Sequence, residues 1–329
     1  MKHVVRHLMV VIAALVVSGV ASAQSDLRRR VAITFDDLPI AGSVAKDEAT
    51  RKNMTLSLLQ TLAHHEIPAI GFVNEGQLYN DETLDEGRVN LLRLWVAAGF
   101  ELGNHSYSHP DLHQTPLEEY QANVLRGGRV TRQLLAEHRK EPEYFRHPFL
   151  HTGTDIEKKH AFEAFLIEHE YRVAPVSIDN SEWIFARAYD LAMQTDNAAL
   201  ASTVGGEYVE YMLKMFAFYE DQSQQLFGRN IDHVLLVHAN ELNSAWFGVL
   251  ADRLVDRGYE FISLSEALED PAYDSPDTYT GPGGITWLHR WAITKKVDPA
   301  MFRGEPETPP YILKLTELRE HNYPSDGEE

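Results

Sequence analysis

Residues 31–40 read VAITFDDLPI, an apolar β-forming run followed at once by two adjacent carboxylates. The run at 31–35 predicts a buried strand that ends at Asp36 and Asp37. Side chains of neighbouring strand residues point to opposite faces, and two like charges at a strand end cost free energy unless a cation lies nearby. The stretch therefore predicts a strand end with a positive group close to it.

Six further β-like runs follow, and helical segments separate most of them. Strands that alternate with helices indicate a parallel sheet built with right-handed crossover connections. About seven such units favour a barrel over an open sheet, with functional residues at the carboxyl ends of the strands. The further strands are expected at residues 67–73, 100–105, 143–146, 171–179, 233–239 and 259–264.

Residues 1–23 have the features of a secretory signal peptide. Lys2 and Arg6 precede an apolar run at 8–17, and the small-residue pattern Ala-Ser-Ala at 21–23 resembles a cleavage site. A single-pass anchor is the alternative, but the apolar run is short for a membrane span. We therefore expect an exported protein, periplasmic or secreted, without stable membrane insertion after cleavage.

The rest of the chain divides into a barrel at residues 24–269 and a C-terminal extension at 270–329. Within the barrel, residues 184–230 are expected to form a helical insertion, whose aromatic residues either pack extra helices onto the barrel or form a lid beside a pocket. The extension is rich in Pro and Gly, and it either wraps around the barrel or is partly disordered. Its last six residues, 324–329, are expected to be disordered.

The composition excludes some classes of function. The chain has 329 residues and a formal net charge of −19. Only two basic residues fall in segment 1–23, so the remainder carries 28 basic and 49 acidic residues and a net charge of −21. A chain this acidic does not suggest a nucleic-acid-binding protein. It contains no cysteine, which excludes disulfides and thiolate chemistry.

Two histidines, His105 and His109, lie four residues apart at the end of the strand expected at 100–105. On a helical turn or tight loop, this spacing lets two imidazoles reach one ion. The chain has 16 histidines, so pairs at this spacing also occur by chance. In a parallel barrel, however, Asp37 would lie on the same rim. Two imidazoles and one carboxylate can bind a divalent cation and leave positions open for water and substrate.

This cation would be the positive group missing beside the acid pair. Asp37 would bind it, and Asp36, which faces another way, would take a proton from water activated at the metal. The alternative is that the two acids cap a helix or form a turn, because Asp favours both. Without the two histidines, that alternative would be preferred.

Five short motifs follow one another along the chain: TFDD at 34–37, HSYSHP at 105–110, FRHPF at 145–149, DNSEW at 179–183 and LLVH at 235–238. They occur in the order and approximate spacing of the polysaccharide deacetylases, carbohydrate esterase family 4, and this chain resembles that family from about residue 31 to residue 268. The resemblance implies an α/β fold, a deformed (β/α) barrel of about seven parallel strands, here with a helical insertion and an extended C-terminal tail. It also implies removal of acetyl groups from N-acetylated glucosamine polymers or xylan.

The resemblance assigns roles to the residues that match the first three motifs. Asp36 would be the general base. Asp37, His105 and His109 would bind one divalent metal ion, Zn²⁺ foremost, with Co²⁺ or Ni²⁺ as alternatives. Arg146 would hold Asp36 in place and keep it ionised. The alternative is that Arg146 lies on the surface without such a role.

The last residue of the third motif and the two later motifs supply the remaining roles. The backbone N–H of Phe149 would help to form the oxyanion hole, and Trp183 would form a wall of the acetyl pocket or part of the core. His238 would be the general acid for the departing amine. Glu182 or Asp179 would orient His238.

The chain departs from the family pattern at several positions. Leu38 stands where the family has Gly, and Phe149 stands where it has Tyr. Gly153 comes later than usual after the arginine motif, and Glu182 replaces Asp. None of these changes removes a proposed ligand or the base, so they affect the expected substrate more than the expected reaction.

We therefore expect a metal-dependent hydrolase that removes acetyl groups from peptidoglycan- or chitin-type glycans or oligosaccharides in the cell envelope. One alternative is hydrolysis of a non-sugar C–N bond, such as that of a cyclic imide or ureide, on the same scaffold. The second alternative is a carbohydrate-binding protein without catalytic activity. The intact set of acids, histidines and arginine argues against it.

Overall fold

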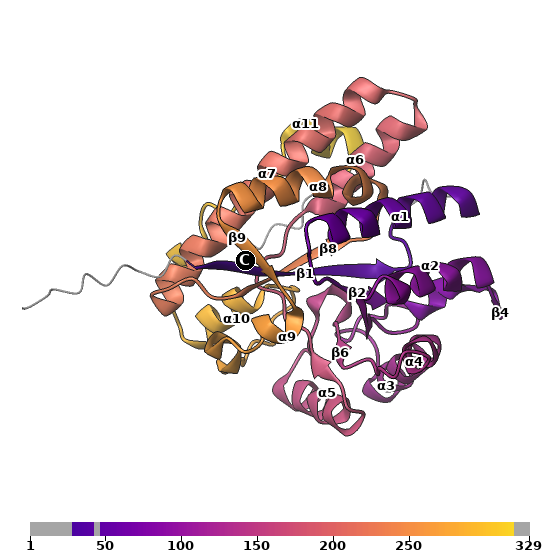
Figure 1. The fold of residues 1–329 in the computed structure, drawn as a ribbon. Coiled ribbons are helices and arrows are strands. Elements are labelled where there is room, and N and C mark those ends of the chain that lie inside the picture. The colour runs from indigo at the N-terminus through magenta and orange to yellow at the C-terminus, as the bar shows by residue number, and fades with distance from the viewer. Residues whose placement is uncertain (1–27, 43–46, 319–329) are drawn as a thin grey trace, which may run out of the picture.

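The computed structural model describes residues 28–42 and 47–318, so the expected signal peptide and the tail at 324–329 lie outside the described residues. A curled sheet of seven parallel strands forms the centre, and helices surround it (Figure 1). All seven strands predicted from the sequence are present. The strands are β1 (Arg29–Leu38), β2 (Ile70–Val73), β5 (Glu101–Asn104), β6 (Tyr144–Phe145), β7 (Arg172–Val173), β8 (His233–His238) and β9 (Tyr259–Ile262).

The strand order β7-β6-β5-β2-β1-β8 places β1 in the interior of the sheet. One edge of β1 pairs with β8 along most of its length, and the other edge pairs first with β9 and then with β2. The segment after β7 closes the sheet, because the backbone N–H groups of Ser177 and Ile178 both donate to Val234 O over 3.0 Å. Leu236 N in turn donates to Ile178 O. The predicted deformed (β/α) barrel is therefore confirmed.

Eleven α-helices are found in the described residues, and a small hairpin of β3 (Tyr79–Asn80) and β4 (Thr83–Leu84) lies outside the main sheet. Within 28–42 and 47–318, no helix combines the length and apolar character needed to cross a membrane. The helices are α1 (Glu48–His64), α2 (Glu86–Ala97), α3 (Leu117–Arg126), α4 (Arg129–Ala136), α5 (Ile156–Glu168), α6 (Glu182–Gln194), α7 (Ala198–Phe227), α8 (Glu241–Asp256), α9 (Leu264–Ala267), α10 (Trp287–Thr294) and α11 (Pro310–Thr316).

Residues 117–136 form two helices, α3 and α4, separated by Gly127 and Gly128. A Cβ atom at Gly127 would lie only 2.2 Å from the carbonyl carbon of Ser106. The chain therefore needs glycine at the break because this turn packs directly against the backbone of the loop that carries His105 and His109.

The insertion consists of α6 and α7, which pack against each other and against α8. Asn197 caps the first turn of α7 by accepting a hydrogen bond from Leu200 N. Most aromatic residues of the insertion are buried, which favours the alternative that they pack extra helices onto the barrel over the alternative that they form a lid. The buried ones are Phe185, Tyr189, Tyr208, Tyr211, Phe216 and Tyr219.

The C-terminal extension wraps around the barrel over the part that the structure describes, residues 270–318. The side chains of Leu288, Trp291 and Ile312 are buried in the main hydrophobic core. At the start of α10, Trp287 N donates a 2.8 Å hydrogen bond to Val176 O beside the closing segment of the sheet. The described residues of the extension thus pack against the core and against the closing segment of the sheet.

Candidate metal and acid–base site

The two acids of the opening stretch lie at the carboxyl end of β1, where the strand is irregular. The register of β1 against β2 shifts between Phe35 and Leu38, and Asp37 has a left-handed backbone with φ of 59°. Such a bulge re-aims side chains at a strand end. Strict alternation would send Asp36 and Asp37 to opposite faces, but here both lie near His105.

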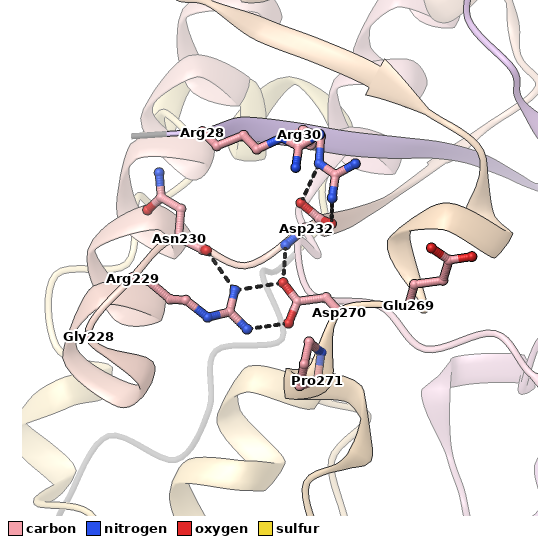
Figure 2. A pocket seen from close by; sticks show the side chains of 9 residues that line it. All are labelled: Arg28, Arg30, Gly228, Arg229, Asn230, Asp232, Glu269, Asp270 and Pro271. Atoms are coloured by element: carbon pink, nitrogen blue, oxygen red, sulfur yellow. Dashed lines mark hydrogen bonds and ion pairs between the residues drawn. The ribbon is translucent and has the colours of Figure 1, made fainter. Parts of the chain in front are cut away.

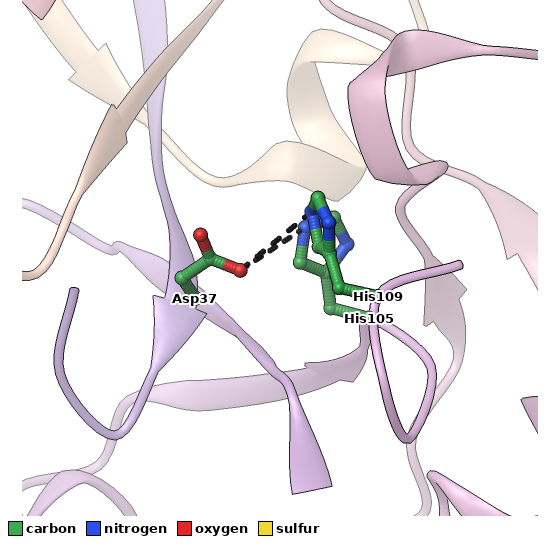
Figure 3. Close-up of side chains that lie close together, drawn as sticks. All are labelled: Asp37, His105 and His109. Carbon is green, nitrogen blue, oxygen red and sulfur yellow. Dashed lines mark ion pairs between the residues drawn. The ribbon is translucent and has the colours of Figure 1, made fainter. Parts of the chain in front are cut away.

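Asp37 faces two imidazoles that come from the loop after β5 (Figure 3). Its Oδ1 lies 3.6 Å from His105 Nε2 and 3.8 Å from His109 Nε2. These separations are too long for hydrogen bonds. They suit atoms around one small cation, because two ligands about 2.0–2.2 Å from a zinc ion lie roughly 3–3.5 Å apart.

The environment of these atoms fits a divalent cation. Asp37 Oδ1 is buried and accepts no hydrogen bond from any residue in the described part of the chain. His105 Nδ1 lies 2.8 Å from Arg146 O, so it is the donor nitrogen and leaves the Nε2 lone pair available. Burial, together with His105, lowers the pKa of His109 to about 4, which keeps that imidazole neutral. Neutral imidazoles are the form that binds metals.

The charge of Asp37 is also favoured at this position. Burial by itself would raise the pKa of its carboxyl group, but His105, His238 and His109 lower it, and the balance lies below the ordinary value. An ionised carboxylate beside two imidazole nitrogens is the donor set that borderline cations such as Zn²⁺ prefer.

Asp36 is held by a buried arginine. Arg146 Nη1 lies 3.4 Å from Asp36 Oδ2, and both side chains are almost completely inaccessible to solvent. Arg146 also donates 2.9 Å hydrogen bonds to Ala174 O and Thr34 Oγ1. The guanidinium is therefore fixed on three sides and compensates the charge of the carboxylate. Asp36 Oδ1 has no hydrogen-bond partner within the described residues.

His238, at the end of β8, is the register partner of Asp36 on β1. Its Nδ1 lies 2.8 Å from Oε2 of Glu182, which is the first residue of α6. Glu182 is buried, and its other oxygen accepts hydrogen bonds from the side chains of Asn240 and Asn243. Burial would lower the pKa of His238, but the hydrogen bond and charge of Glu182 outweigh it and raise the pKa to about 9.

The other predicted site residues lie around this centre. Asp179 Oδ1 accepts a 2.8 Å hydrogen bond from Asn180 N, and burial raises the pKa of this carboxyl group to about 6. Of the two acids proposed to orient His238, Glu182 is the one in contact. Trp183 is 40% exposed. Phe149 is 54% exposed, and its ring centroid lies 4.5 Å from that of His109.

The N-terminal part of the chain, which supplies most of these residues, is similar to a known protein family. The family model described as polysaccharide deacetylase matches residues 23–163. This part of the chain is similar to the polysaccharide deacetylase family. The matched segment contains Asp36, Asp37, His105, His109 and Arg146. Glu182 and His238 lie beyond it.

Two curated chitooligosaccharide deacetylases are similar to the chain. The one from Bradyrhizobium sp. is 31% identical over 118 residues, which cover 35% of this chain and 46% of that protein. The one from Sinorhizobium fredii is 33% identical over 107 residues, or 32% of this chain and 41% of that protein. The chain thus spans less than half the length of these curated relatives.

Among solved structures, the chitin deacetylase of Colletotrichum lindemuthianum is similar to 75% of this chain, with 90% of its own chain covered. The identity is 20% and the TM-score is 0.49. Similarity at this level carries no information about activity.

Leu38, which replaces a glycine of the deacetylase family pattern, is completely buried beside β2. A Cβ atom at Gly71 of β2 would lie 2.0 Å from Leu38 Cδ1. The larger side chain after the acid pair is therefore accommodated by a glycine on the neighbouring strand.

Sequence reasoning missed the two asparagines that fix Glu182. They belong to the stretch HANELN at 238–243, where Asn240 caps α8 by accepting from Asn243 N over 2.9 Å. An Asn directly after a strand and before a helix predicts a cap. The pattern could not show that the same side chain also donates to Glu182, because that contact spans 58 residues.

A second group near the deacetylase-family site consists of Asp111, His113 and His151. His151 Nδ1 lies 2.7 Å from Asp111 Oδ1, which is a hydrogen bond. The rings of His113 and His151 are stacked at 3.9 Å with an interplanar angle of 2°. The lone pairs of parallel imidazoles lie in separate planes and cannot converge on one ion, so this arrangement is a stacked, hydrogen-bonded cluster rather than a metal site.

A pocket of about 470 Å³ lies at the opposite end of β1 (Figure 2). Arg30, the second residue of β1, pairs there with Asp232 over 2.8 Å, and Arg229 pairs with Asp270 over 2.7 Å. Six residues of strand, roughly 20 Å, separate Arg30 from Asp36. These arginines already form ion pairs within the pocket, which is therefore distinct from the metal and acid–base site.

Proposed function

We propose that this protein hydrolyses the acetamide group of N-acetylated amino-sugar glycans or oligosaccharides and releases acetate. The observation that carries the proposal is the orientation of Asp37 Oδ1, a buried oxygen without a hydrogen-bond partner among the described residues, toward two histidine nitrogens. The similarity of residues 23–163 to the polysaccharide deacetylase family supports the same reaction.

Asp37, His105 and His109 would hold one divalent cation, Zn²⁺ foremost, with Co²⁺ or Ni²⁺ as alternatives. When bound, such an ion polarises the amide carbonyl and lowers the pKa of water in the site. The carboxylate and the two neutral imidazoles supply the charge and lone pairs that this binding requires.

Asp36 would act as the general base. Its Oδ1 would take the proton from the water that attacks the acetyl carbonyl carbon, while Oδ2 stays with Arg146. General acid–base help of this kind is typically worth about 10²–10⁴-fold in rate. The arginine is a positioning residue, because it fixes the carboxylate and compensates its charge.

His238 would act as the general acid. Its Nδ1 is occupied by Glu182, which leaves Nε2–H to donate to the nitrogen that departs when the C–N bond breaks. The raised pKa of about 9 keeps this histidine protonated at neutral pH. Acetate and a free amine are then released, and the two proton transfers balance.

Phe149 and Trp183 would form the acetyl-binding part of the site, with the Phe149 N–H donating to the oxyanion. Their exposure, 54% and 40%, is compatible with contact to a sugar or acetyl group. The features of a signal peptide at residues 1–23 favour action outside the cytoplasm, on peptidoglycan- or chitin-type material in the envelope.

The test is acetate release from N-acetylglucosamine oligomers, peptidoglycan and acetylated xylan, measured in parallel with Zn²⁺, Co²⁺ or a chelator. Acetate should be released from the amino-sugar substrates and should require metal, and its release should fall by about 10²–10⁴-fold in Asp36→Asn. Ring opening of a cyclic imide without acetate release from any glycan would instead favour the alternative C–N hydrolase.

A further inference from the structure

The C-terminal extension reaches the loop that carries Phe149. Gly284 lies so close to this loop that an added Cβ atom would be 1.7 Å from Phe149 O and 3.2 Å from His151 Cδ2. The extension, which lies outside the family match at 23–163, therefore contacts the Phe149 loop beside the candidate metal site.

Arg290, on α10, makes the second set of contacts. This arginine is completely buried, and it donates hydrogen bonds to Leu150 O, to Thr152 Oγ1 over 2.7 Å and to Ile285 O over 3.0 Å. The Trp287 ring lies 4.5 Å from the guanidinium carbon. One buried side chain thus joins the residues after Phe149 to the extension itself.

The loop needs support because its backbone is strained. Phe149 and Leu150 are consecutive residues other than glycine in the left-handed region, with φ of 57° and 54°. L-residues rarely adopt this conformation, and it persists only where surrounding contacts impose it. The Phe149 ring packs edge-on against His109 at 4.5 Å, so the direction of this turn also decides what borders the metal-facing imidazole.

We infer that residues 284–290 complete the active site, and that Gly284 and Arg290 are positioning residues that hold the Phe149–Leu150 turn against His109. The inference deepens the proposed function and rests on it for the role of the Phe149 N–H. Displacement of the turn would move that N–H away from the developing oxyanion, an interaction that acts in the transition state. It would leave the metal-facing residues in place.

The test compares wild-type protein with Gly284→Ala and Arg290→Lys in the full chain. Each variant should lower kcat for acetate release by about 10-fold or more with little change in KM, because a misplacement of about 1 Å can cost up to 10²-fold. Bound metal per chain should stay unchanged. Hydrogen exchange of the amides at 149–152 should become faster in both variants.

Gly205→Ala is the matched control. Gly205 packs against Trp246 on α8, where an added Cβ atom would be 2.0 Å from Cε2, so this change also crowds a packed glycine but lies in the helical insertion. It should lower thermal stability without changing exchange at 149–152, and kcat should stay within about 2-fold of wild type.

Equal kcat losses in Gly284→Ala and the control, or unchanged exchange at 149–152 in both test variants, would overturn the inference. If the wild-type protein releases no acetate, the proposed function fails separately, and the exchange measurement still decides whether Gly284 and Arg290 hold the turn. If Arg290→Lys does not fold, Gly284→Ala carries the test, because it removes no hydrogen bond.

Discussion

The carboxylate of Glu182 lies 2.8 Å from Nδ1 of His238, and Asn240 and Asn243 bind its other oxygen. The carboxylate is 1% exposed, so water does not screen its charge. One carboxylate oxygen of Glu182 is bound by the two asparagines, so the other oxygen is directed to the imidazole of His238. The negative charge therefore acts fully on His238 and favours its protonated form.

The pH dependence of activity should report this pair. Because the general acid must be protonated and the pKa of His238 is about 9, kcat/KM should remain high through neutral pH and fall as the pH rises through about 9. Glu182→Gln removes the charge, so the basic limb should move down by at least one unit, toward the ordinary value of 6.5. The measurement is the pH profile of kcat/KM for acetate release, with metal content as the control. A basic limb that stays near 9 in this variant would assign it to another group.

Metal binding should depend on the histidines after β5. The wild-type protein is expected to hold one divalent ion per chain, and the double variant His105→Ala, His109→Ala should lose it, because a single carboxylate binds such ions weakly. Metal per chain is measured by elemental analysis after dialysis. His113→Ala is the matched control, since its ring is stacked on His151 and should not affect metal content. Full occupancy in the double variant would rule out this assignment.

The two adjacent acids should separate into different phenotypes. Asp36→Asn should retain the metal and lose about 10²–10⁴-fold in turnover, because it removes the base but not a ligand. Asp37→Asn should weaken metal binding, and added metal should restore part of its activity. Parallel metal titrations and rate measurements check both variants. The reverse pattern, with metal lost only in Asp36→Asn, would mean that the ligand and the base are exchanged.

The contact between Leu38 and Gly71 should dominate the stability of the β1–β2 pair. Gly71→Ala should destabilise the protein by about 1–3 kcal/mol, because the added methyl group overpacks the space beside Leu38. In Leu38→Ala, Gly71→Ala the second substitution should cost much less than it does alone. Urea unfolding of the two single variants and the double variant measures this coupling. Strictly additive losses would show that the two side chains do not compete for the same space.

The sequence predicted the elements with strong local patterns and missed what depends on distant contacts. All seven strands were found because each is an apolar run between helical segments. The expected strand at 171–179 is shorter, since only Arg172–Val173 pairs in the ladder and Ser177–Ile178 turns to close the sheet on β8. Closure depends on a partner more than 50 residues away, which no local pattern encodes.

The same distinction holds within the site. The spacing of His105 and His109 and the acids after β1 pointed to the metal-facing triad, and the structure brings those side chains together. The choice between Asp179 and Glu182 could not be made from the sequence, because both precede Trp183 by a few residues. It is decided by where α6 begins, since its first residue is the one that reaches His238.

The C-terminal extension was the least predictable part. It is rich in Pro and Gly and has no clear periodicity, so its contacts could not be assigned to a face. Its main tie to the site is Arg290, which binds backbone and hydroxyl oxygens of the Phe149 loop. Such contacts leave no complementary charge in the sequence by which a partner could be recognised.

The pairing of β1 with β8 has a consequence for how this scaffold can change. Asp36 and His238 are opposite one another in a parallel ladder, so the spacing of the proposed base and acid is set by the strand separation of about 4.8 Å. The turn at Phe149, α6 and the extension are attached at the rim and can vary without altering that spacing. Changes in the surrounding loops could therefore alter which acyl group and leaving group are accepted, while the sheet keeps the proposed base and acid at a fixed spacing for proton transfer.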